Sequence, residues 1–208
     1  MRVVVGSEQS LKSRQADLER HLDAMSRFIE RHKDVPSPGC SLVLRSAGSL
    51  PAQALMLMKD TLADAGVGAR AILAKLEPKD DLKQLFDTLS ALSPEADDRD
   101  LIRWARNPRL LDAHEQVTYG ADMCWVGDAM RRDADKRNPL ILFETEAPDA
   151  ARRANHAFKA LWGASVPVPG RHLEMPGLSK PSGSYGQVDE TQVPAMQTRN
   201  QGWPLVRH

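Results

Sequence analysis

A strand–helix–strand pattern over residues 41–75 constrains the fold more than any other feature of the sequence. Residues 41–45 form a short apolar strand, residues 52–65 form a helix rich in Leu, Met and Ala, and Gly66 is typical of a helix end. Residues 67–75 predict a second strand. Two strands joined by a helix of this length should lie parallel, with a right-handed crossover. The pattern therefore predicts an α/β fold.

The rest of the middle region alternates helices with short apolar runs, which predicts a mixed sheet flanked by helices. Further helices are expected over residues 80–92 and 149–162, and short strands over 101–105, 110–119, 124–126 and 139–143. Gly127 and Asp128 are turn residues, and we expect them to interrupt the strand that begins at Cys124.

An amphipathic helix is expected over residues 7–33. Its apolar stripe could dock on its own domain or pair with a second copy of the chain, and docking within one chain is the commoner case. His21 and His32 fall on the polar side of this helix, where we expect them to be solvated. The stripe comprises Leu11, Leu18, Leu22, Met25 and Ile29, which recur at helical spacing.

Composition changes near residue 166 and divides the chain into three segments. Residues 166–208 hold 6 of the 14 prolines and are rich in Gly, Ser and Gln, which predicts an extended tail without a core of its own. Trp203 in this tail needs a surface on which to dock. The expected organisation is an N-terminal helix (1–38), an α/β domain (39–165) and the extended C-terminal tail (166–208).

Charge, cysteine content and hydropathy exclude several classes of protein. Lys and Arg number 28 and Asp and Glu number 28, so the net charge is zero and nucleic acid is not an expected partner. The 2 cysteines exclude a disulfide scaffold and a Cys-rich zinc site. No apolar run reaches the ~18 residues of a membrane span, and the start turns polar too soon for a signal peptide. We therefore expect a cytoplasmic protein, and the motif search predicts neither a metal nor a cofactor.

One histidine and one cationic cluster are the candidate site residues. His114 is flanked by strand-forming residues and precedes the Gly–Asp pair. Guanidinium groups suit phosphate because each can donate two hydrogen bonds at once. Four cations against the interleaved Asp133 and Asp135 leave a local charge of +2, so a solvated loop with self-paired charges is an equal alternative. The candidate anion-binding residues are Arg131, Arg132, Lys136, Arg137 and Asn138.

The order of these features resembles one half of the phospholipase D-like (HKD) superfamily. The resemblance covers residues 39–165 and rests on the strand–helix–strand opening that ends at residues 66–70, on the strand with His114, and on a closing helix with Phe158 and Trp162. In that family a histidine attacks phosphorus and forms a phosphohistidine, and a second histidine from the other half protonates the leaving oxygen. A lysine holds the phosphate, and an acidic residue orients the histidine.

The resemblance implies that His114 is the nucleophile, with Gln116 at the lysine position and Asp122 one place after the acidic position, which falls on Ala121. Glutamine supplies no charge, and loss of one comparable donor typically costs ~10²–10³ in rate. Arg131 or Arg132 could replace the missing cation. Gly127-Asp128 stands for the family's Gly-Ser, and Asn138 is followed by Pro139-Leu140 instead of x-Glu.

These departures predict a degenerate member with weak or no phosphodiesterase activity. Because a complete site needs two halves, the resemblance also implies a homodimer with both copies of His114 near its axis. The alternative is a non-catalytic scaffold or regulatory protein that binds a partner or an anion.

Overall fold

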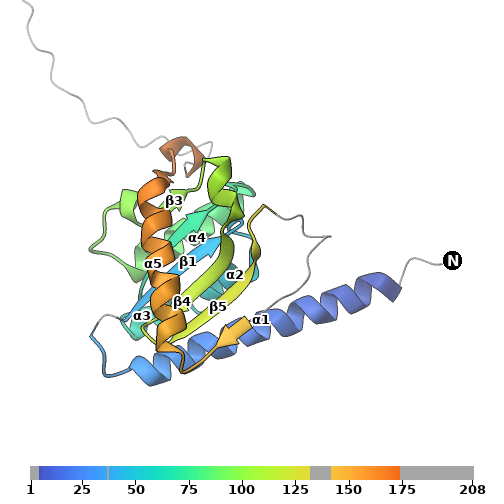
Figure 1. Ribbon diagram of the computed structural model, residues 1–208, viewed down its shortest axis with the longest axis vertical. Helices are drawn as coiled ribbons and strands as arrows, with labels where there is room; N and C mark the ends of the chain where they lie inside the picture. Colours follow the sequence, from blue (N-terminus) through green and yellow to red (C-terminus); the bar gives the residue numbers. More distant parts are fainter. Residues whose placement is uncertain (1–4, 37, 132–141, 174–208) are drawn as a thin grey trace, which may run out of the picture. The chain divides into compact units, whose positions relative to one another are not determined.

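The computed structural model describes residues 5–36, 38–131 and 142–173 (Figure 1). The chain divides into two units, Met1–Met175 and Pro176–His208, and every described residue belongs to the first. The described residues form five α-helices and a seven-stranded mixed sheet, so the predicted α/β class is confirmed. None of the described helices is long and apolar enough to cross a membrane.

The predicted strand–helix–strand opening is confirmed, with one change in its helix. Strands β1 (Gly39–Leu44) and β2 (Gly68–Leu73) pair in parallel. The connection between them is two short helices, α2 (Leu50–Leu57) and α3 (Lys59–Asp64), which meet at Met58, where one continuous helix was expected. Gly66 has a φ of 66°, which only glycine adopts without strain, and this turns the chain from α3 into β2.

The remaining strands extend the sheet on both sides, in the order β6-β5-β4-β1-β2-β3-β7. Helix α4 (Lys79–Leu92) leads to β3 (Ile102–Trp104), which is parallel to β2. Strands β4 (His114–Tyr119), β5 (Met123–Ala129) and β6 (Leu142–Glu144) are antiparallel neighbours, and α5 (Pro148–Ala164) and β7 (Val166–Pro167) follow.

Two expectations for this half of the sheet need correction. The predicted strand over 110–119 begins only at His114, because Pro108–Asp112 form a 3-10 helix. Gly127 and Asp128 do not interrupt β5, which continues to Ala129 by means of a bulge. The described start of the predicted tail docks on the domain, because β7 pairs with β3, and Val168 and Leu173 pack on the domain's core. Trp203 lies outside the described residues.

Helix α1 (Val5–His32) docks on its own chain, as expected for the commoner of the two alternatives. Ala24, Met25 and Phe28 are buried in the same hydrophobic core as β1 and β4. This core fills the sheet face covered by α1, α2 and α4, whereas α5 crosses the opposite face (Figure 1). Successive side chains of β1 point to opposite faces of the sheet, so Leu42 and Leu44 belong to the first core and Val43 packs with Phe158 of α5.

The expectation that His21 and His32 are solvated is wrong. His21 is 2% exposed, its Nδ1 lies 3.4 Å from the Tyr119 hydroxyl, and its ring meets the edge of Trp125. Burial lowers the pKa of His21 to about 4. His21 precedes Met25 and Phe28 by four and seven residues, so it belongs to the buried stripe that the apolar residues define.

Candidate functional site

Strand β4 places its side chains alternately on the two faces of the sheet, and His114 is its first residue. Glu115 points toward α2, where its Oε1 accepts hydrogen bonds from Ser49 Oγ and from the backbone N–H of Arg45, both at 2.9 Å. Gln116 points the other way, and its Nε2 donates to the carbonyl oxygen of Ala154 in α5 at 2.8 Å. His114 therefore lies on the α5 side of the sheet.

A β-bulge next to His114 fixes the orientation of its imidazole. His114 pairs with Ala129 and Gln116 pairs with Val126, so β5 carries one extra residue between these two pairs. The extra residue allows the Gly127 carbonyl to reach the histidine, at 2.8 Å from Nδ1. A Cβ on Gly127 would lie 2.6 Å from the Trp125 ring, so the close approach at this bulge requires glycine.

This hydrogen bond also determines which imidazole nitrogen is reactive. A carbonyl oxygen only accepts, so Nδ1 of His114 must carry the proton and donate it. In the neutral ring Nε2 then holds the free lone pair, and the side chain is exposed. This arrangement suits His114 to act as a nucleophile or a general base. A backbone carbonyl orients its ring, whereas the resemblance implies a carboxylate in that role.

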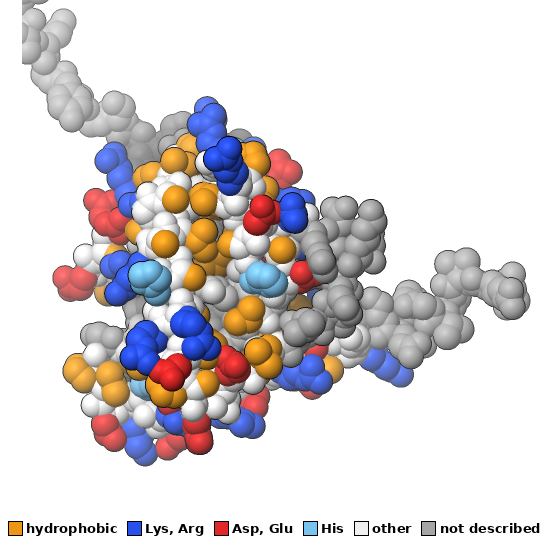
Figure 2. Space-filling model, viewed as in Figure 1, with side chains coloured by type: hydrophobic (Ala, Val, Ile, Leu, Met, Phe, Trp, Pro, Cys, Tyr) orange, Lys and Arg blue, Asp and Glu red, His pale blue; other side chains and the backbone are white. Residues whose placement is uncertain are grey.

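His114 lines a groove of about 490 Å³ between α5 and strands β4 to β6. In Figure 2 hydrophobic side chains lie along the hollow beside α5, and histidine side chains lie on both sides of it. The other polar residues that line the groove are Gln116, Cys124, Glu144 and Arg153. Arg153, an exposed residue near the start of α5, is the cation among these described lining residues.

Two of these polar groups are ill suited to reaction. Gln116 is 8% exposed, and its amide is already bonded to Ala154. Burial first, and then the charge of Glu144, raise the pKa of the Cys124 thiol to about 11, so it stays protonated at neutral pH. Cys124 Sγ lies 3.7 Å from Glu144 Oε2 and is a weak donor to it. Neither residue supplies a charge to a ligand in the groove.

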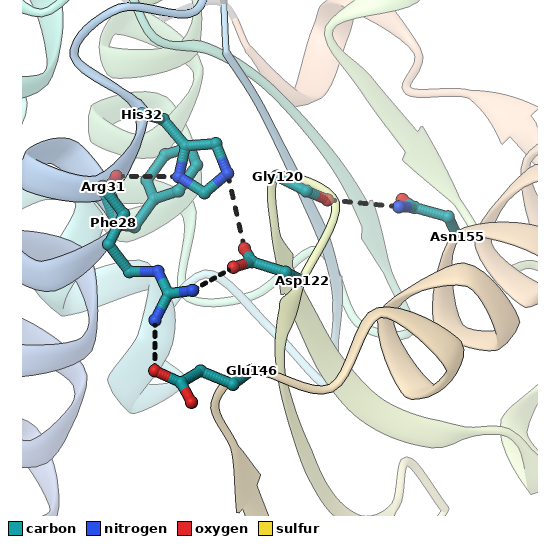
Figure 3. A network of polar contacts seen from close by, with 7 residues as sticks. All are labelled: Phe28, Arg31, His32, Gly120, Asp122, Glu146 and Asn155. Carbon is teal, nitrogen blue, oxygen red and sulfur yellow. Dashed lines mark hydrogen bonds and ion pairs between the residues drawn. The ribbon is translucent and has the colours of Figure 1, made fainter.

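Asp122 lies at the opposite end of the β4–β5 hairpin from His114, so the structure does not bring these two predicted site residues together. Figure 3 shows its carboxylate between two residues of α1, with Arg31 Nη2 at 2.6 Å and His32 Nε2 at 3.4 Å. Arg31 also reaches Glu146, at 3.1 Å. Asp122 thus joins the hairpin turn to the end of α1, and Arg31 joins the end of α1 to the segment before α5.

The predicted anion-binding residues are described only in part. Arg131 is exposed, and its Nε lies 3.0 Å from Asp112 Oδ1, two residues before His114. Its backbone N–H donates to the Leu111 carbonyl at 2.9 Å, which keeps it beside the segment that leads into β4. Arg132, Lys136, Arg137 and Asn138 lie outside the described residues.

A buried polar network behind His114 was missed in the sequence. Arg45 is 8% exposed, and its guanidinium donates to the carbonyl oxygens of Ala129 and Met130 at the end of β5. Glu115 is 3% exposed and bonds to the backbone of Arg45. Alternation could have indicated this, because Glu115 shares a face with Val117 and Tyr119, which are apolar and predicted to be buried.

The described residues contain no group of three or more His, Cys, Asp or Glu side chains placed to hold a metal ion. No protein-family model matches the chain, and no curated protein matches it.

Proposed function

We propose that the chain is a degenerate phospholipase D-like protein whose groove beside His114 takes a phosphate-containing ligand, with weak or no phosphodiesterase activity. The observation that carries the proposal is the bond from His114 Nδ1 to the Gly127 carbonyl, which leaves Nε2 as the free nitrogen. The succession of β1, β2, the histidine strand β4 and the closing helix α5 adds support, because the resemblance rests on this order.

In the proposed reaction, Nε2 of His114 attacks phosphorus, a P–N bond forms, and the P–O bond to the leaving group breaks. The leaving oxygen takes a proton from a second histidine. Water then attacks the phosphohistidine, gives its proton back to that second histidine and frees Nε2. Because one chain resembles one half of such a site, the second histidine is His114 of a second copy, and the proposed assembly is a homodimer.

Arg153 provides the cation in this proposal. It lines the same groove as His114, whereas Gln116 is held by the backbone of α5. An exposed arginine can donate two hydrogen bonds to a pair of phosphate oxygens, but it is less fixed in place than a buried lysine. The proposal therefore predicts phosphate binding with slow turnover, at a rate reduced by ~10²–10³ for a missing preorganised donor.

The test is hydrolysis of bis-p-nitrophenyl phosphate together with binding of inorganic phosphate. We expect His114→Ala to abolish hydrolysis, and Arg153→Gln to weaken phosphate binding about tenfold, the loss of one charge-assisted contact. His156→Ala and Arg152→Gln are matched controls, because both residues are exposed on α5 and neither lines the groove. Equal hydrolysis by wild type and His114→Ala would exclude catalysis, and unchanged phosphate binding in Arg153→Gln would exclude the anion site.

A second candidate is a non-catalytic scaffold or regulatory protein. This alternative is favoured because two residues at motif positions make contacts that hold the fold together: Gln116 bonds to α5 and Asp122 pairs with α1. Under this alternative His114→Ala leaves the dimer and its partner binding intact. Measuring the mass in solution of the full chain and of a chain truncated after Leu173 tests the assembly. A monomer in both cases would contradict the dimer of either candidate.

A further inference from the structure

A second and larger cavity, of about 860 Å³, lies at the amino ends of β1 and β2 beside α5. Its volume falls within the ~300–1,000 Å³ of typical small-molecule sites. It shares no lining residue with the groove of His114. Whatever binds in this cavity is therefore independent of the proposed phosphate site.

One wall of the cavity is held in place by polar contacts between three separate elements. Asn155 of α5 donates to the Gly120 carbonyl at 3.3 Å, as Figure 3 shows, and it accepts a hydrogen bond from Ser41 of β1 at 3.3 Å. His32 of α1 completes the wall. Gly120 has a φ of 64°, and a Cβ there would lie 2.6 Å from His32 Nε2, so glycine is required for this close approach. The cavity is thus a preformed feature of the fold.

The charged side chains that line the cavity are unbalanced. Arg70 and Lys159 line it, and none of its described lining residues is acidic. Neither cation forms an ion pair with a described carboxylate, and the guanidinium of Arg70 lies 5.9 Å from the centroid of the Trp162 ring. Because the chain as a whole has zero net charge, this local excess is not a consequence of a basic protein.

The rest of the lining is mostly apolar. It includes Phe158 and Trp162 of α5, together with Ala69 and Ala96. An apolar surface of this kind favours a hydrocarbon chain or ring, and two cations that pair with no described carboxylate favour a negative charge on the same ligand. We propose that the cavity binds a small amphiphilic anion, an apolar chain or ring that carries one carboxylate or phosphate group.

The first test is calorimetric titration of the full chain with decanoate, decyl phosphate and decyltrimethylammonium. We expect saturable binding of one molecule of either anion, at least tenfold tighter than the cation. Lys159→Gln should weaken anion binding about tenfold, the loss of one charge-assisted contact. Arg152→Gln, on the same helix but outside the cavity, should leave it unchanged. No binding of either anion, or equal binding of the cation, overturns the proposal.

A second variant tests the location. Gly39 lines the cavity, and a Cβ on it would meet no heavy atom within 4 Å, so Gly39→Phe places a large side chain at the cavity wall from a Cβ position that is free of clashes. Gly163 also has open space around it but does not line the cavity, which makes Gly163→Phe the matched control. We expect Gly39→Phe to abolish decanoate binding and Gly163→Phe to retain it. Retained binding in Gly39→Phe places the anion elsewhere and overturns the proposal.

Discussion

The two faces of the sheet differ in how completely they are covered. On one face, α1, α2 and α4 enclose a continuous core that includes Phe28, Leu42 and Leu85, all fully buried. On the other face, α5 packs over two smaller clusters, one around Val43 and Phe158 and one around Cys124. Both the groove of His114 and the larger cavity have α5 residues in their walls.

This difference separates the sources of stability from the candidate sites. A closely packed face offers no room for a ligand, and removing atoms from it leaves a cavity. A single helix over a wide sheet leaves open channels along its sides, and polar side chains there stay accessible. Sequence changes in the groove of His114 should therefore affect binding more than folding, whereas the larger cavity also has Cys40 and Ala69 of the first core in its wall.

The largest expected effect comes from truncating one aromatic residue on each face. Phe28→Ala should cost about 4 kcal/mol of unfolding free energy, because Phe28 of α1 is fully buried and packs against Tyr119 of β4. Phe158→Ala should cost about half as much, since Phe158 is 8% exposed and already borders the larger cavity. Urea unfolding monitored by circular dichroism measures both. Equal costs would show that the two faces are packed alike.

A pH effect of about 3 kcal/mol is expected at His21, on the tightly covered face. The folded protein keeps His21 neutral, with a pKa of about 4 against 6.5 in the unfolded chain, because burial disfavours the charged ring. Below pH 6.5 the unfolded state binds a proton that the folded state does not. Stability is therefore complete above pH 6.5 and falls by about 3 kcal/mol as the pH drops to about 4.

Urea midpoints between pH 7 and pH 4 measure this effect. His21→Phe should remove most of the slope, because Phe can fill the space between Trp125 and Phe143 without titrating. His156→Phe is the control, since His156 is exposed on α5 and should leave the slope unchanged. An unaltered pH dependence in His21→Phe would mean that another group is responsible.

Sequence reasoning predicted the tightly covered face better than the open one. Burial in a continuous core requires apolar residues at regular spacing. The strands β1 and β2 and the stripe of α1 therefore show strong hydrophobic patterns in the sequence. The bulge at Gly127 carried no such signal, because glycine and aspartate resemble a turn when their neighbours across the sheet are unknown. The contact of Asp122 with Arg31 joins residues 91 positions apart and has no local pattern.

The smallest expected effect is on stability, from breaking the ion pair of Asp122 at the turn end of the β4–β5 hairpin. Asp122→Asn removes the ion pair with Arg31. The side chains of Arg31 and Asp122 are 39% and 24% exposed, so the expected loss of unfolding free energy is only ~0.5–1 kcal/mol. Asp23→Asn is a matched control, because Asp23 pairs with Arg27 on α1 and the two side chains are 59% and 61% exposed. Its cost should be ~0.3 kcal/mol, as for other exposed helix pairs.

The same variant distinguishes a structural role for Asp122 from a role in the site. Because Asp122 lies at the far end of the hairpin, Asp122→Asn should leave any hydrolysis that depends on His114 unchanged. A tenfold or larger fall in that rate, with stability unchanged, would instead support the role that the phospholipase D-like resemblance gives to an acidic residue near this position. The hairpin would then have to transmit an effect from one end to the other, and the contrast between its ends would fail.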